Sequence, residues 1–143
     1  MGVLLSIVVF IILLSFLVIC HEVGHFVASR KIGVVVEEFG VGLGPRLFAK
    51  KVGVTTYSIN LVPIGAFVRP VGEDDPAVEG GLARKGPWAR MLVYAAGPLV
   101  NLLLAFLLLA IFFMAVVAVS VVGNEGLMVQ SVNEGSPAQI GGM

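Results

Sequence analysis

The chain has 143 residues, of which 58% are hydrophobic and only 13% are charged. This balance excludes an ordinary soluble domain and indicates a membrane protein that lies in a lipid bilayer. Nine basic and nine acidic residues give a net charge of zero, which offers no basis for nucleic-acid binding, and a single cysteine, Cys20, excludes a disulfide within the chain.

The first apolar segment, residues 3–20, carries no charged side chain. As a helix it would be about 27 Å long, close to the thickness of the hydrocarbon core of a bilayer. It lacks the basic start and the small-residue cleavage site of a signal peptide. We therefore assign residues 1–30 to a retained first transmembrane helix.

This segment leads into the sequence His21-Glu22-Val23-Gly24-His25. Two histidines four residues apart lie on one face of a helix, close enough to bind one metal ion. Glu22 is offset around the helix and can instead take a proton from water that a zinc ion activates, as in the H-E-x-x-H pattern of zinc peptidases. Because ionisable groups are costly inside a membrane helix, the pattern favours a catalytic zinc site over a chance pair of histidines.

The first charges after this motif are Arg30 and Lys31. If they mark the membrane surface, His25 lies roughly 7 Å and His21 roughly 13 Å below it. The metal would then lie inside the membrane. The extended pattern of one class of soluble zinc proteases is absent, because Ala28 and Lys31 stand where it requires glycine and histidine.

Residues 31–70 predict a membrane-associated, β-hairpin-rich loop. Residues 34–36 and 39–41 are mostly β-branched or aromatic, and Gly40, Gly42 and Gly44 interrupt this stretch. Residues 57–61 alternate, and residues 50–53 predict a turn. An exposed strand edge could pair with an unwound substrate, or the hairpin could simply cover the helices. Both interpretations stay open.

Residues 71–90 form a polar linker rich in glycine, proline and acidic residues. Its acids could supply a third metal ligand, but such segments are usually solvated, which is the interpretation we favour. The nine Lys and Arg residues all lie between the two apolar segments. The positive-inside rule therefore places loop 30–90 in the cytoplasm and both termini of the chain on the extracytoplasmic side.

Residues 91–122 are uncharged and long enough to span a membrane. Proline is favoured at the first position of a helix, so the spanning part is predicted to begin at Pro98. Asn101 is the one strongly polar side chain in this segment. It could hydrogen-bond between helices, or it could lie near the metal or the scissile peptide.

Residues 123–143 resemble a strand and a turn, too short for an independent domain. Together the segments resemble the site-2 protease family, the intramembrane zinc metalloproteases, in its bacterial branch with a PDZ insertion. The similarity rests on five motifs in order, residues 21–26, 39–45, 63–65, 96–101 and 135–138. One departure is Ala66-Phe67, where relatives often carry glycine and tyrosine.

The resemblance implies a mainly α membrane protein with two transmembrane helices and the start of a PDZ-like domain at residues 123–143. It implies His21 and His25 as Zn²⁺ ligands and Glu22 as the catalytic acid and base. The implied substrate is a transmembrane protein of the cell inner membrane, such as a membrane-bound anti-sigma factor or a signal-peptide remnant. Because the family's third ligand is an Asp in a later segment, we expect residues 1–143 alone to bind zinc poorly and to cleave nothing.

Two other functions are compatible with a metal motif in a membrane helix. A membrane metal-ion transporter would need further ligands along a pathway, and Gly24 and Phe26 occupy positions where polar residues or proline would be expected. A catalytically inactive membrane scaffold would not need Glu22, and its presence argues against that alternative.

Overall fold

The computed structural model describes residues 2–122, 134 and 137. The chain divides into two compact units, Met1–Phe106 and Leu107–Met143. The described part of the second unit is the end of the last helix together with Glu134 and Pro137. Apart from these two residues, the predicted start of a PDZ-like domain at 123–143 lies outside the described residues.

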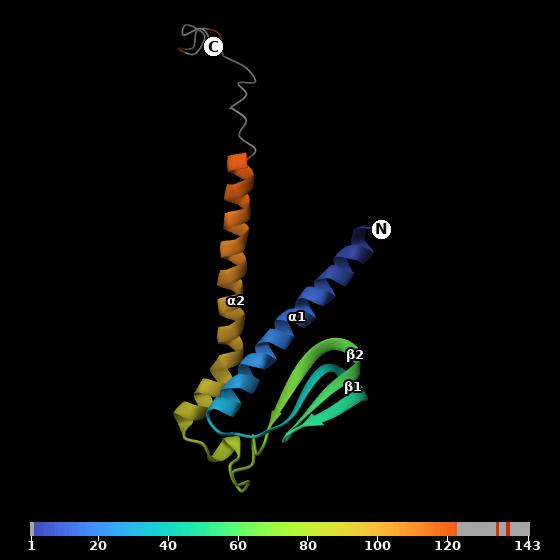
Figure 1. The fold of residues 1–143 in the computed structure, drawn as a ribbon, viewed down its shortest axis with the longest axis vertical. Helices are drawn as coiled ribbons and strands as arrows, with labels where there is room; N and C mark the ends of the chain where they lie inside the picture. The colour runs from blue at the N-terminus through green and yellow to red at the C-terminus, as the bar shows by residue number, and fades with distance from the viewer. Residues whose placement is uncertain (1, 123–133, 135–136, 138–143) are drawn as a thin grey trace. The chain divides into compact units, whose positions relative to one another are not determined.

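The elements follow one another as two long helices with a sheet between them (Figure 1). In order they are α1 (Gly2–Lys31), β1 (Val36–Val52), β2 (Thr55–Pro70), the 3₁₀ turn η1 (Leu82–Arg84) and α2 (Pro87–Val122). Both α1 and residues Pro87–Ala118 of α2 are long and apolar enough to cross a membrane, with mean hydropathies of 3.3 and 2.9. The two apolar helices predicted from the sequence are thus present as candidate spans.

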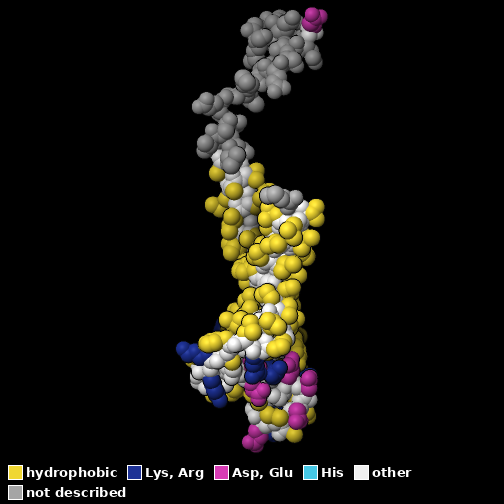
Figure 2. Space-filling view, turned by 90° about the vertical axis from the view of Figure 1, so that its right-hand side faces the viewer, with side chains coloured by type: hydrophobic (Ala, Val, Ile, Leu, Met, Phe, Trp, Pro, Cys, Tyr) yellow, Lys and Arg dark blue, Asp and Glu magenta, His cyan; other side chains and the backbone are white. Residues whose placement is uncertain are grey.

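Large apolar side chains cover the outer surface of both helices. Phe10 is 64% exposed on α1 and Leu103 is 67% exposed on α2, as suits a surface that faces lipid. Figure 2 shows hydrophobic side chains over the helices, whereas the charged side chains of the first unit gather at one end. Within that unit, the end with the charged residues is the part suited to water.

Helix α2 begins earlier than the sequence predicted. Pro87 is its first residue and the helix continues through Pro98, so Pro98 is not the first residue of a helix as predicted. Both prolines suit a first helical position, and the glycine that precedes Pro87 ends the loop there. Proline is tolerated within a membrane helix because neighbouring groups can satisfy the carbonyl that it leaves free.

Strands β1 and β2 are long and bent (Figure 1), and they form one antiparallel sheet in which residues of the first half of β1 pair with two different parts of β2. Phe39 in the first half of β1 pairs with both Val68 and Tyr57, so that this half lies between the two halves of β2. The second half of β1 pairs with the first half of β2 and ends at the pair Val52–Thr55. The hairpin confirms the β-rich character predicted for residues 31–70.

The strand ends differ from the prediction in two places. Residues 34 and 35 precede the first strand, and residues 50–52 belong to β1. The turn, predicted at residues 50–53, is formed by Gly53 and Val54 alone. The positive φ of Gly53 (63°) allows this two-residue hairpin connection.

An aromatic contact fixes the sheet beside the metal motif of α1. The ring of Phe26, next to His25, lies 5.5 Å from Phe39 and 6.1 Å from Tyr57, measured between ring centroids. Further along α1, Ser15 Oγ donates a hydrogen bond of 3.4 Å to the carbonyl of Pro63. Ser15 precedes the motif by six residues, about 9 Å of helix, so the sheet extends along the apolar part of α1.

The loop between β2 and α2 is anchored by buried contacts. Leu82 has no exposed surface, its N–H donates to Val71 O at 2.9 Å, and Ala83 N–H donates to Gly72 O at 2.9 Å. The buried core of the first unit brings together Ala28, Val34, Leu82 and Val93. Buried Leu82 therefore attaches the middle of the predicted linker 71–90 to the core, and the last four residues of that linker belong to α2.

A buried carboxylate lies at the centre of the sheet. The side chain of Glu38 is 3% exposed, accepts a hydrogen bond of 2.7 Å from Ser58 and pairs with Arg46 and Arg69. Burial alone would raise the pKa of Glu38, but the hydrogen bonds from Ser58 and Arg46 and the charges of both arginines outweigh it and lower the pKa.

This lowered pKa predicts a pH-dependent stability. The carboxylate stabilises the fold above its unfolded pKa, near the ordinary value of 4.5, and the contribution is lost as the pH falls through the lower folded value. We expect Glu38→Gln to cost about 1.5–3 kcal/mol at pH 7 and to remove this acid dependence. Thermal unfolding of the full-length protein in detergent, followed by circular dichroism from pH 7 to pH 3, measures both. Glu37→Gln, an exposed neighbour, is the matched control, and an unchanged pH profile in Glu38→Gln would contradict the assignment.

Candidate metal centre

The three predicted site residues lie together near the C-terminal end of α1. His21 and His25 are one helical turn apart, with ring centroids separated by 4.8 Å and ring planes at 77°. One ligand atom from each of His21, Glu22 and His25 lies within 4.8 Å of the others. All three side chains are partly buried. The spacing argued from the sequence therefore produces a group that can hold one metal ion.

The opposite wall of this site is Gly97 in α2. A Cβ added to Gly97 would lie 2.6 Å from Nε2 of His21 and closer still to Nε2 of His25. Both Nε2 atoms thus lie so close to Gly97 that any side chain at this position would clash with them. Two imidazoles and a carboxylate whose ligand atoms lie within 4.8 Å of one another are a donor set that zinc accepts. Gly97 does not have a positive φ, so it provides room rather than an unusual backbone conformation.

Helices α1 and α2 approach closely because small residues face each other. A Cβ added to Gly24 would lie 2.6 Å from the carbonyl oxygen of Ala96. Small residues allow the backbones of membrane helices to come together in this way. Gly24, which lies between the two histidines in the sequence, therefore brings them against α2.

The ring of His25 is oriented by the backbone of α2. Its Nδ1 lies 2.7 Å from the carbonyl oxygen of Val93, which can only accept, so Nδ1 carries the proton and donates it. In this tautomer the lone pair of Nε2 is free to bind a metal. A hydrogen bond from the second ring nitrogen to a backbone carbonyl is the usual support of a histidine ligand.

Glu22 faces a pocket of about 270 Å³ between α1, the end of β2 and α2. His25, Phe67, Glu73 and Tyr94 also line it. Glu73 belongs to the loop whose acids the sequence left as possible third ligands. Its side chain is exposed, partial desolvation and the charge of Asp74 raise its pKa, and it is not one of the three grouped metal-binding residues. The pocket gives Glu22 access to a reacting group beside the histidines.

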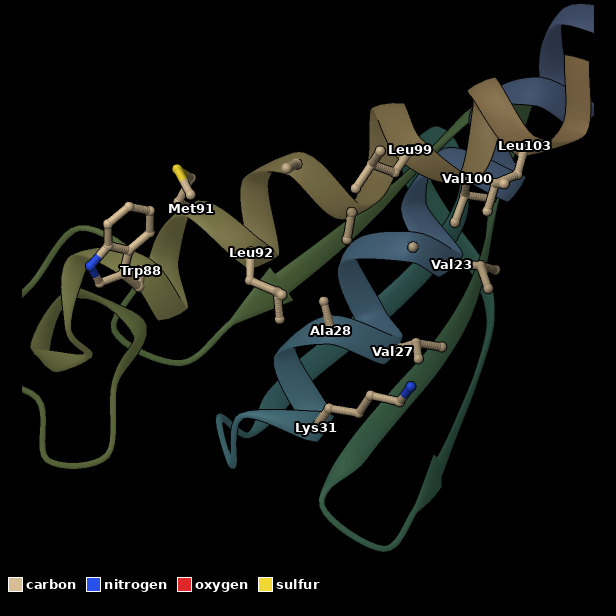
Figure 3. A pocket seen from close by; sticks show the side chains of 13 residues that line it. Val23, Val27, Ala28, Lys31, Trp88, Met91, Leu92, Leu99, Val100 and Leu103 are labelled. Atoms are coloured by element: carbon tan, nitrogen blue, oxygen red, sulfur yellow. The ribbon is translucent and has the colours of Figure 1, made fainter. Parts of the chain in front are cut away.

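A larger groove of about 700 Å³ separates parts of α1 and α2 and is lined mostly by apolar side chains (Figure 3). Val23 and Val27 of α1 and Leu92 and Leu99 of α2 are among the residues that line it. The side chains of His21, Glu22 and His25 do not line this groove. The smaller pocket beside Glu22 is therefore the candidate reaction site.

Two residues of α2 at the site were missed or left open by sequence reasoning. Gly97 lay within a quoted motif, but its role became visible only when the facing histidines were placed. Asn101 lies beside His21, with its Nδ2 3.4 Å from Nδ1 of that ring. The contact joins α2 to α1, as the first predicted role of Asn101 requires, and it also places Asn101 beside the candidate metal site.

These features define a membrane protein whose first helix presents a histidine pair suited to a metal ion. The chain belongs to peptidase family M50, whose model matches residues 9–139. This confirms the resemblance to the site-2 protease family inferred from the sequence, and membership of a membrane-embedded family together with two candidate spans indicates a membrane location.

Several curated relatives carry the name "Putative zinc metalloprotease". One from Thermotoga maritima is 35% identical over 146 residues, which cover 96% of this chain and 27% of the relative. Another from Chlamydia pneumoniae is 40% identical over 114 residues, 71% of this chain and 18% of the relative. A third from Clostridium perfringens is 42% identical over 95 residues, 66% of this chain and 28% of the relative. The chain thus spans less than a third of these relatives, and the family's cofactor is zinc.

Proposed function

We propose that the full-length protein is an intramembrane zinc endopeptidase that hydrolyses a peptide bond in or near a transmembrane segment of another membrane protein. The observation that carries this proposal is the grouping of His21, Glu22 and His25, whose ligand atoms lie within 4.8 Å of one another, with Glu22 and His25 lining the neighbouring pocket.

His21 and His25 would hold the ion, and the rest of the protein would add a further ligand, which the family resemblance implies is an Asp. When bound, zinc supplies Lewis-acid activation of water and of the substrate carbonyl. The Glu22 carboxylate accepts a proton from the attacking water, whose oxygen bonds to the carbonyl carbon. Glu22 then returns this proton to the leaving nitrogen as the C–N bond breaks.

The proposed location is the cell inner membrane, with loop 30–90 in the cytoplasm. The basic residues between the two apolar segments and the gathering of charged side chains at one end of the first unit (Figure 2) support this orientation. The substrate we propose is a transmembrane protein such as an anti-sigma factor or a signal-peptide remnant. A PDZ-like domain that begins after α2 also remains part of the proposal.

Metal removal tests the proposal directly. We expect chelation of zinc from the purified full-length protein in detergent to abolish cleavage of a model transmembrane substrate, and added zinc to restore it. The readout is the cleavage product on a gel together with the zinc content of the protein. A parallel measurement of zinc flux in proteoliposomes separates the alternatives, because a transporter would move zinc without cleaving the substrate. Cleavage that persists in a zinc-free preparation would contradict the proposal.

A further inference from the structure

Asn101 has an unusual hydrogen-bonding environment beside His21. Its Nδ2 lies 3.4 Å from Nδ1 of His21, while its Oδ1 is buried and has no hydrogen-bond partner among the described residues. A buried acceptor without a partner costs about 1–3 kcal/mol. The arrangement therefore calls for an explanation in which the oxygen is satisfied.

The chemistry of the ring decides which amide atom faces it. If the NH₂ group of Asn101 donated to Nδ1, the proton of neutral His21 would lie on Nε2, the ring nitrogen beside Gly97. That nitrogen could then not bind a metal ion. A half-turn of the amide exchanges Oδ1 and Nδ2 without moving other atoms. Oδ1 then accepts from Nδ1–H and the lone pair of Nε2 becomes available, while the NH₂ group takes the buried position that has no hydrogen-bond partner among the described residues.

We propose that Asn101 is a positioning residue that accepts a hydrogen bond from Nδ1–H of His21 and so fixes the tautomer in which Nε2 binds zinc. The inference rests on the proposed function only in taking His21 as a zinc ligand. Asn101 acts through His21 and makes no contact with substrate in this role.

The arrangement around His25 supports this assignment. Val93, Gly97 and Asn101 follow one another at intervals of four residues and so lie on one face of α2. Val93 O accepts from Nδ1 of His25 at 2.7 Å, Gly97 faces both Nε2 atoms, and Asn101 lies at Nδ1 of His21. With Oδ1 of Asn101 toward the ring of His21, each histidine donates from Nδ1 to an acceptor on this face of α2. Each histidine then has an unprotonated Nε2 beside Gly97.

Zinc affinity of the full-length protein, measured by competition with a chromophoric chelator, tests the role of Asn101. We expect Asn101→Leu to lower the affinity by about 10- to 100-fold, the range found when the outer partner of a ligand is removed. Asn101→Asp, whose carboxylate can only accept, is expected to retain it. Leu102→Ala, an exposed neighbour on α2, is the control and should bind zinc as the unaltered protein does.

Two results would overturn the inference. The first is unchanged zinc affinity in Asn101→Leu. The second is an equal loss in Asn101→Leu and Asn101→Asp, because it would show that the NH₂ group, or the general packing of the residue, is what matters. Zinc affinity is independent of proteolysis, so a protein that binds zinc through His21 but cleaves nothing would remove the proposed function and leave the role of Asn101 intact.

Discussion

Full-length protein that carries Glu22→Gln is expected to bind zinc normally but to cleave a transmembrane substrate about 100 to 10,000 times more slowly. Positioned general acid–base groups contribute rate factors of this size. Glutamine keeps the shape of Glu22 and its place in the pocket beside His25, but it cannot accept a proton from water. Initial rates of substrate cleavage and the zinc content of the same preparation provide the two measurements.

A matched control for this variant is Glu79→Gln, which also removes one negative charge but lies in the loop, where the side chain is 95% exposed. It should cleave at the normal rate. Normal cleavage by Glu22→Gln would exclude Glu22 from the reaction. Loss of zinc from Glu22→Gln would instead show that the carboxylate acts as a ligand.

Substitution of Gly97 by alanine is expected to abolish zinc binding and, with it, peptide cleavage. The new methyl group would clash with both histidine rings, because it would lie 2.6 Å from Nε2 of His21 and closer still to Nε2 of His25. Neither ring can move away without losing contact with its Nδ1 partner on α2. We therefore expect a loss of zinc affinity greater than the roughly 10- to 100-fold effect of altering an outer partner. Metal analysis of the purified full-length variant measures it.

Gly86→Ala is the appropriate control, because nothing lies within 4 Å of a Cβ at this position just before α2. It should retain zinc and activity. Circular dichroism and thermal unfolding establish whether Gly97→Ala remains folded. A folded Gly97→Ala protein with a normal zinc content would show that zinc binding does not depend on the close approach of the histidines to this glycine.

The metal motif was predictable because its geometry is local. The spacing of His21 and His25 places both rings on one face of any helix that contains them, and the uncharged residues before them make a helix the expected conformation. The similarity of five motifs in order to a known family also identified the family correctly.

Features that depend on tertiary contacts were not predictable. Pro98 and Pro87 are equivalent as possible first residues of a helix, and packing of the preceding loop, with Leu82 buried, accompanies the start at Pro87. Leu82 is an isolated apolar residue in a polar loop, without a periodic pattern to mark it as core. The role of Gly97 depends on two side chains more than seventy residues earlier, which no local pattern reveals.

The different partners of the two rings have a consequence for inherited variation. His25 is held by a main-chain oxygen at Val93, which every replacement of that residue would still possess. His21 depends on a side chain, so a single codon change at Asn101 can remove its support. Homologues should therefore tolerate diverse apolar residues at the first position while accepting few alternatives at the second, an asymmetry that an alignment of orthologous sequences can measure.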